Sequence, residues 1–283
     1  MIEQVLEKIF EKVDTLPTFP KTAQKAFALL REDEVDFKEV ERVIKSDPGI
    51  TANFLKLVNS AAFALPQKVD SLFKAFMFLG VNQIKFILMA SIAKQYYKDE
   101  LTGYGIQAHD IWFHSILCGI IAEEIAKNMD LSYEETESLY IASILHDIGK
   151  IVLDLYTKLS AEEFYKLMEE NPERDFIQIE WLVLGVDHGL VGGYLLEKWE
   201  FPKTISFAVR AHHDADLMLQ NKVSAIVALA NALANVLGVG GSLDAFNYYL
   251  PEKLLDIVNI EKEKIWEILK VAFERSVLIK REF

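Results

Sequence analysis

Cysteine is almost absent from this chain, because Cys118 is the only one among 283 residues. A single cysteine cannot form an intrachain disulfide, and it excludes a zinc site built mainly from thiolates. Since Cys118 falls within an apolar helical pattern, we interpret it as an inert buried thiol.

Basic residues and long hydrophobic runs are also scarce. Thirty Lys and Arg residues face 43 Asp and Glu residues, which gives a formal net charge of −13. Proteins that bind duplex nucleic acid usually carry the opposite balance, so no such partner is expected. No apolar run approaches the ~18 residues that cross a bilayer, and the N-terminus lacks the features of a targeting segment. The sequence therefore predicts a cytoplasmic protein without a membrane partner.

Glycine and proline, with 13 and 7 residues, rarely interrupt the chain. Apolar residues recur at spacings of three and four, and no alternating strand of five residues stands out. Helix starts are indicated at Asp36, at Asp47 before Pro48, and at Ser132, where Glu135 completes a capping box. The prediction is an all-α fold.

Two glycine-containing segments indicate the organisation of the chain. Gly103 and Gly105 lie within residues 99–106, between two helical patterns, and predict a boundary there. Our division is an N-terminal helical lobe over residues 1–102 and a second helical lobe with a C-terminal extension over residues 103–283. A further loop is predicted at residues 238–242.

All six histidines belong to the second lobe, and several lie where an apolar helical face is expected. Asp110 and His114 are one helical turn apart on the same face. His146 and Asp147 end a strongly apolar run, where burying such groups is costly unless something binds them. Alone, a histidine on an apolar face can be a satisfied core residue.

Two more segments strengthen the pattern, with His188 in one and His212 and His213 in the other. Mixed imidazole and carboxylate ligands are typical of Zn, Mn, Fe or Co rather than Ca. We therefore predict that four helices converge on a divalent transition metal. The predicted ligands from these segments are Asp110, His114, His146, Asp147, His188, His212 and His213.

The same residues resemble the HD superfamily of metal-dependent phosphohydrolases. His114 matches its first histidine and His146-Asp147 its His-Asp pair, while the later histidines look like the additional ligands of the HD-GYP branch. The Gly-Tyr-Pro segment of that branch is absent. Asn231 stands where the final aspartate of the superfamily is expected, and its amide oxygen can coordinate without negative charge.

Motifs in the first lobe are similar to the HDOD domain, and they follow one another in matching order over roughly residues 10–215. The resemblance implies a two-lobed helical HDOD fold with an HD-type helical bundle in the second lobe, and a bacterial signalling role. The motifs are residues 16–20 (LPTFP), Asp47-Pro48, Asn59-Ser60, Leu79-Gly80 and residues 199–202 (WEFP).

Two functional hypotheses follow. The first is a stand-alone regulatory module that retains an Fe, Mn or Zn site, has little or no hydrolase activity, and binds a signalling protein or a small phosphate-containing ligand. The alternative is a metal-dependent phosphohydrolase acting on a nucleotide or cyclic dinucleotide. In that alternative Asp147 is catalytic, and Lys150 binds phosphate or protonates the leaving oxygen. Lys150 can equally cap a helix C-terminus.

Asn59 carries a separate structural prediction. It ends the helical pattern that begins at Asp47, in otherwise apolar surroundings. We expect its amide to tie the helix C-terminus to a following loop, with a ligand contact as the alternative.

Overall fold

Helices dominate the computed structural model, which describes residues 2–16, 18–238 and 250–283 and side chains from residue 6 onward. Within these ranges the only β pairing is an isolated bridge between Leu101 and Ile106. The all-α prediction is confirmed. Of the loop predicted at residues 238–242, all but Gly238 lies outside the described residues, as does Pro17 of the first motif.

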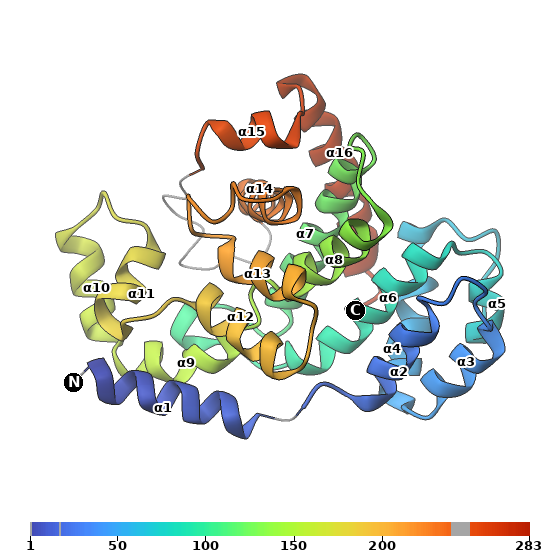
Figure 1. Cartoon of the computed structure of the whole chain (residues 1–283), viewed down its shortest axis with the longest axis horizontal. Coiled ribbons are helices and arrows are strands. Elements are labelled where there is room, and N and C mark those ends of the chain that lie inside the picture. The colour runs from blue at the N-terminus through green and yellow to red at the C-terminus, as the bar shows by residue number, and fades with distance from the viewer. Residues whose placement is uncertain (1, 17, 239–249) are drawn as a thin grey trace.

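The first 104 residues supply one helix that stands apart and a group of helices on the right of Figure 1. Helix α1 leads into a linker, and the group then closes with the long helix α6. The elements are α1 (Ile2–Thr15), α2 (Lys21–Leu29), α3 (Phe37–Lys45), α4 (Pro48–Val58), η1 (Ala61–Phe63), α5 (Leu72–Phe76), α6 (Val81–Tyr96) and η2 (Thr102–Tyr104).

The second part of the chain forms a helical bundle with a C-terminal extension. Helices α7, α8 and α14 occupy its interior, and α15 and α16 follow at the top and right of Figure 1. The elements are α7 (Asp110–Ala126), α8 (Tyr133–Leu145), α9 (Lys150–Leu159), α10 (Ala161–Glu170), α11 (Phe176–Leu184), α12 (His188–Lys198), α13 (Lys203–Ala211), α14 (Lys222–Val236), α15 (Lys253–Val258) and α16 (Lys262–Lys280).

The predicted helix starts are confirmed in their atomic detail. The Asp36 side chain accepts hydrogen bonds from two backbone N–H groups at the start of α3. Asp47 does the same for Ile50 N at the start of α4, and Ser132 forms the full capping box with Glu135. Each cap satisfies donors that the first turn of a helix leaves without partners.

Helix α7 is the structural centre of the bundle. It is buried on every face between Ile111 and Ala122, and it packs against α8, α14 and α16. A helix that is apolar all round belongs in a protein interior. Polar side chains on α7 are therefore held inside the core, away from solvent.

Asn59 plays the predicted structural role. As the C-cap of α4 it donates to the carbonyls of Leu55 and Val69, both at 2.8 Å. Its own side-chain oxygen accepts from Val69 N at 2.8 Å. The amide thus joins the end of α4 to the loop that follows.

Helix α1 lies along α9 and α11, away from the helices that follow it in sequence (Figure 1). Tyr156 Oη of α9 donates to the Lys8 carbonyl at 3.0 Å, and the Phe10 ring contacts the Tyr194 ring edge-on. The first helix therefore packs on the second part of the chain. The division at residue 102 stays a prediction.

Membrane-span criteria give a limited result for this chain. Within the described ranges, no single helix combines the length and the apolar composition that crossing a membrane requires. Helices α11 and α12 meet the length and composition only when taken together, and they are bent by 72° relative to one another.

Candidate metal centre

The turn between α8 and α9 carries the central acid of the site. His146 caps the C-terminus of α8, Asp147 follows, and Gly149 precedes α9. A Cβ at position 149 would collide with the backbone carbonyl of His188 at the start of α12. Glycine at this position therefore lets the turn approach α12 closely, which brings Asp147 to His188.

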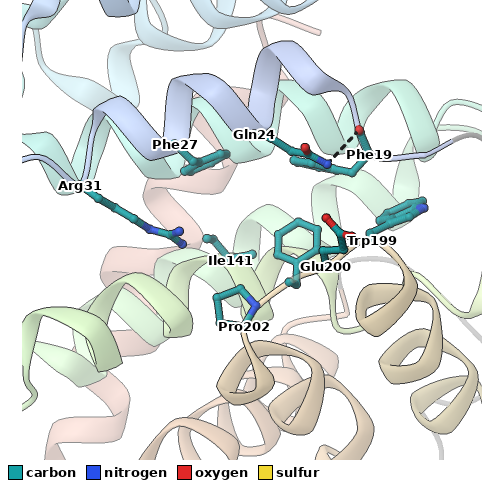
Figure 2. Close-up of a pocket in the computed structure, with 9 residues that line it drawn as sticks. Phe19, Gln24, Phe27, Arg31, Ile141, Trp199, Glu200 and Pro202 are labelled. Atoms are coloured by element: carbon teal, nitrogen blue, oxygen red, sulfur yellow. Dashed lines mark hydrogen bonds between the residues drawn. The ribbon is translucent and has the colours of Figure 1, made fainter.

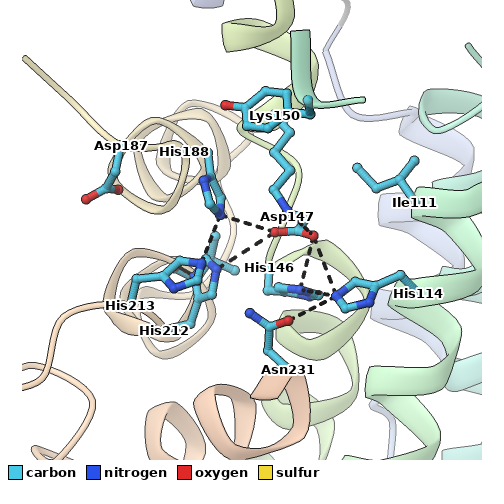
Figure 3. Close-up of polar contacts among 12 residues, drawn as sticks. Ile111, His114, His146, Asp147, Lys150, Asp187, His188, His212, His213 and Asn231 are labelled. Atoms are coloured by element: carbon cyan, nitrogen blue, oxygen red, sulfur yellow. Dashed lines mark hydrogen bonds and ion pairs between the residues drawn. The ribbon is translucent and has the colours of Figure 1, made fainter. Parts of the chain in front are cut away.

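Figure 3 shows side chains from five parts of the bundle turned toward Asp147. We call one group the α7 side and the other the α12 side, with the Asp147 carboxylate between them. The α7 side consists of His114, Cys118, His146 and Asn231, and the α12 side consists of His188, His212 and His213.

On the α7 side, the ring nitrogens of two histidines face each other. His114 Nε2 lies 3.3 Å from His146 Nε2 and 3.0 Å from Asn231 Oδ1. Asp147 Oδ2 lies 3.3 Å from His146 Nε2 and 3.7 Å from His114 Nε2. All four side chains are buried. Sequence reasoning predicted this convergence and interpreted Cys118 as inert; its sulfur lies 3.5 Å from His114 Nε2.

On the α12 side, the histidines face the other oxygen of the Asp147 carboxylate, Oδ1. Asp147 Oδ1 lies 3.3 Å from His188 Nε2 and 3.9 Å from His212 Nε2. His213 Nε2 lies 3.0 Å from His188 Nε2. One ligand atom from each of these four residues falls within 4.8 Å of the others. The two oxygens of one carboxylate thus face two separate sets of ligands.

The backbone determines which ring nitrogens can act as ligands. Nδ1 of His146 contacts the Ser143 carbonyl at 2.9 Å, and Nδ1 of His212 contacts the Val209 carbonyl at 2.6 Å. A carbonyl oxygen only accepts, so Nδ1 carries the hydrogen and a neutral ring has its lone pair on Nε2. Both Nε2 atoms face Asp147, which is the orientation that a metal ligand needs.

The buried ionisable groups of the site shift one another's pKa values. Burial opposes ionisation of Asp147, but the neighbouring His146 ring and the Lys150 ammonium hold its pKa well below the usual range. Burial by itself would lower the pKa of His188. The carboxylates of Glu180 and Asp147 outweigh this effect and raise the pKa to about 10.

The remaining α12-side histidines stay neutral. Burial and the neighbouring imidazoles hold the pKa values of His212 and His213 well below their usual range. The lone pair of His212 Nε2 therefore faces Asp147 Oδ1 at 3.9 Å, an oxygen that also lies 3.3 Å from His188 Nε2. A cation between these ligands would relieve the repulsion, and N and O donors of this kind suit a transition metal. The clusters can hold a metal ion.

Lys150 is fully buried at the first residue of α9. Its ammonium donates to Asp147 Oδ2 at 2.9 Å. This contact supports a role within the site, rather than the alternative role as a cap on a helix C-terminus. The catalytic role predicted for Lys150 and Asp147 stays a prediction.

Two further residues of the site escaped sequence reasoning. Glu180 of α11 is completely buried and accepts from His188 Nδ1 at 2.9 Å and from His188 N at 3.1 Å. Tyr104 donates to the other oxygen of the same carboxylate. A lone glutamate in the apolar segment of residues 176–184 was the available signal. The predicted boundary segment thus reaches into the site through Tyr104.

Asp110, predicted as a ligand, begins α7 one turn before His114. Its Oδ1 atom lies 3.7 Å from the Lys280 ammonium of α16, and it belongs to neither ligand cluster among the described residues. Its role as a ligand stays a prediction.

Two of the sequence motifs meet in a groove away from the histidines (Figure 2). Phe19, from the first motif, contacts Trp199 and Phe201, from the last motif, with ring centroids 5.9 and 4.8 Å apart. The cavity there measures 170 Å³, and Arg31 lines both this cavity and a neighbouring one of 410 Å³. These motifs hold the first helices against the second part of the chain.

Comparison with known proteins places these observations in a family. The HDOD domain family matches residues 16–215. A curated relative from Treponema pallidum (strain Nichols), named only as an uncharacterized protein, is 23% identical over 208 residues. The match covers 73% of this chain and 39% of that protein, so the chain spans about two fifths of the length of its relative.

Solved structures agree with the fold. A protein from Shewanella amazonensis, provisionally named a phosphohydrolase, superposes with a TM-score of 0.75 at 20% identity, covering 97% of each chain. An HDOD domain protein of unknown function from Geobacter sulfurreducens gives a TM-score of 0.71 at 22% identity, covering 98% of this chain and 92% of that one. At such identities the likeness shows the fold alone. The predicted two-lobed helical fold is confirmed.

Proposed function

The chain belongs to the HDOD family, and from this premise we propose that it is a cytoplasmic regulatory module that holds a divalent transition metal and hydrolyses phosphoesters weakly or not at all. One observation carries the proposal. The buried carboxylate of Asp147 faces two sets of metal-ligating side chains, while the position expected for a further carboxylate is occupied by Asn231. Fe, Mn and Zn match these donors.

The loss of one carboxylate favours a regulatory site over a catalytic one. Asn231 is buried, and its neutral Oδ1 lies beside His114. An ion there is held with one negative charge fewer than a site with aspartate would offer. An amide also cannot exchange a proton as a carboxylate does, so the site has one acid–base group fewer for hydrolysis.

An ion network that joins the exposed Arg31 to the buried Glu137 and Lys85 offers a route between the first helices and the site. Glu137 of α8 accepts from Arg31, which follows α2, at 2.9 Å and pairs with the Lys85 ammonium of α6 at 3.2 Å. Helix α8 ends at His146. A shift of α2 would therefore move Arg31 and change its contact with α8, the helix that positions the predicted ligand His146. Such coupling suits a signalling role.

The proposed partner is a signalling protein or a small phosphate-containing ligand. The net charge of −13 argues against duplex nucleic acid as a partner. A ligand of this kind acts on a module by stabilising one of two conformations more than the other.

The alternative function is hydrolysis of a nucleotide or cyclic dinucleotide. A bound divalent ion supplies Lewis acidity for phosphoester hydrolysis. The Lys150 ammonium, which donates to Asp147, favours this alternative, because an ammonium beside a metal site can bind a phosphate oxygen or protonate a leaving group. The provisional phosphohydrolase name of the Shewanella protein points the same way.

Turnover separates the two functions. The metal-free chain is loaded with Fe²⁺, Mn²⁺ or Zn²⁺ and assayed on bis-p-nitrophenyl phosphate, on nucleotides and on cyclic dinucleotides. The regulatory proposal expects rates equal to those of His146→Ala, or only slightly above them, under the same loading. Robust turnover in the native chain that His146→Ala abolishes would overturn it and establish the hydrolase.

A further inference from the structure

Cys118 lies one turn after His114 on α7, and its side chain is buried in the bundle. Its sulfur is 3.5 Å from His114 Nε2, which in turn is 3.3 Å from His146 Nε2. The three ligand atoms all fall within 4.8 Å of one another. The thiol is thus part of a cluster of metal-ligating groups.

Two separations from His114 Nε2 within this cluster match those of ligands that share one tetrahedral ion. With Zn–N bonds of about 2.05 Å and Zn–S bonds of about 2.3 Å, two nitrogens stand about 3.3 Å apart and a nitrogen and a sulfur about 3.6 Å apart. The separations on the α7 side are 3.3 and 3.5 Å. Asp147 Oδ2, 3.3 Å from His146 Nε2, provides a further donor.

We propose that Cys118 is an anionic ligand of the α7 side and supplies the negative charge that Asn231 lacks. This inference rests on the proposed metal-holding function. The thiol proton passes to solvent when sulfur binds the ion, so a thiolate, two imidazoles and the Asp147 carboxylate surround the metal. The thiolate makes this side select Zn²⁺ over Mn²⁺, because sulfur donors favour softer ions.

The α12 side differs in its donors. His188, His212, His213 and Asp147 Oδ1 offer only nitrogen and oxygen. Such donors accept Mn²⁺ and Fe²⁺ as well as Zn²⁺. The two oxygens of Asp147 therefore face a sulfur-containing side and a sulfur-free side, and the two sides differ in metal preference.

Cobalt spectroscopy tests the ligand directly. Metal-free protein is titrated with Co²⁺, since a thiolate bound to Co²⁺ gives a strong near-ultraviolet charge-transfer band that imidazole and carboxylate ligands do not give. Cys118 is the only cysteine, so any such band reports on it alone. We expect the band in the native chain, its loss in both Cys118→Ser and Cys118→Ala, and its persistence in Ser115→Ala, which removes a buried hydroxyl next to His114 on α7.

The outcomes distinguish this inference from the proposed function. Cobalt that binds, with weak visible bands but no thiolate band, overturns the role of Cys118 and leaves the metal-holding function intact. A chain that binds no cobalt overturns both. The folded state of each variant is checked by its circular dichroism and melting temperature.

A double substitution tests the charge argument. Cys118→Ser should lower the Zn²⁺ affinity of the α7 side at least about tenfold while changing Mn²⁺ affinity little, measured by competition with a chelator. Adding Asn231→Asp to that variant should recover most of the loss, because a carboxylate replaces the missing thiolate charge. If Cys118→Ser leaves Zn²⁺ affinity unchanged, the inference is wrong.

Discussion

His188 Nδ1 lies 2.9 Å from Glu180 Oε2, and neither side chain is exposed to solvent. The same carboxylate oxygen accepts from His188 N, so Glu180 holds both the ring and the backbone of the residue that begins α12. With Nδ1 engaged in this way, Nε2 is directed at Asp147 Oδ1. Histidine ligands of metals commonly carry such a carboxylate behind them, which orients the ring.

Glu180→Gln should weaken metal binding on the α12 side. Glutamine keeps the size and an oxygen for His188, but it removes the charge that orients the ring and increases its basicity. Loss of such a supporting group typically costs about 10–100-fold in metal affinity. Mn²⁺ affinity measured against a competing chelator checks this, with Glu197→Gln on the exposed face of α12 as the control. An affinity equal to that of the native chain would contradict it.

Metal content should depend on Asp147 more than on any single histidine. After reconstitution with Fe²⁺, Mn²⁺ or Zn²⁺, we expect about one or more ions per chain, because burying these groups without a cation is costly. Asp147→Asn should reduce the ions bound to both sides, since each side faces one of its oxygens. His212→Ala should affect only the α12 side. Elemental analysis gives the stoichiometry, and a native value far below one ion per chain would refute the expectation.

Local signals in the sequence predicted the helices and much of the site. Caps at Asp36, Asp47 and Ser132 depend on contacts within three residues, so they are readable without the fold. The convergence of the histidines was inferable because His and Asp side chains interrupt apolar helical faces. Their pairing was not, because the distance between α7 and α12 depends on how the whole bundle packs.

The residues that sequence reasoning missed are those whose role depends on distant partners. Glu180 is a single acid in an apolar helix, and nothing nearby in sequence shows that it supports His188. Tyr104 lies in a glycine-containing segment that favoured a boundary, yet its hydroxyl reaches Glu180. Cys118 was interpreted as an inert buried thiol because it falls within an apolar helical pattern, and its proximity to His114 Nε2 is visible only in the fold.

Asn59→Ala should lower the melting temperature by about 5 °C. The side chain makes three hydrogen bonds that join the end of α4 to the next loop. Their loss costs about 2 kcal/mol of unfolding free energy, and each kcal/mol corresponds to about 2–4 °C in a chain of this size. Asn128→Ala is the matched control, because Asn128 is exposed and its side chain donates to Glu124 O. A melting temperature unchanged in Asn59→Ala, with altered signalling, would favour a ligand contact instead.

Lys94→Met should make the chain more stable near pH 7. Burial and the charge of Lys56 lower the pKa of Lys94 from 10.5 to about 8. Between these pH values the unfolded chain therefore binds more protons than the folded chain. As a result, the unfolding free energy of the form with Lys94 increases as pH rises from 8 toward 10.5. Methionine has a similar length and does not titrate, although it loses the contacts of the ammonium with the Trp112 and Phe283 rings.

Urea unfolding of both forms at pH 7, 8, 9 and 10 checks this expectation. The advantage of Lys94→Met should be greatest at pH 7 and shrink steadily toward pH 10. The tyrosines that titrate above this range are present in both forms and cancel in the difference. Lys98→Met, at an exposed position, is the control. A difference between native and Lys94→Met that stays constant with pH would show that Lys94 is not destabilised by burial.

Asn231→Asp should slow metal release from the α7 side. Asn231 Oδ1 lies 3.0 Å from His114 Nε2, so a carboxylate at the same position would face the same ion with an added negative charge. Neutral donors retain a cation less firmly than a carboxylate does. Weak retention should limit any activity, because a lost ion supports no chemistry. Metal dissociation rates and phosphodiesterase rates are measured for both forms at equal loading. We expect slower dissociation in the variant and an increase in any trace hydrolysis, because the aspartate retains the ion for longer. Dissociation at the native rate would show that the charge at position 231 does not limit metal retention.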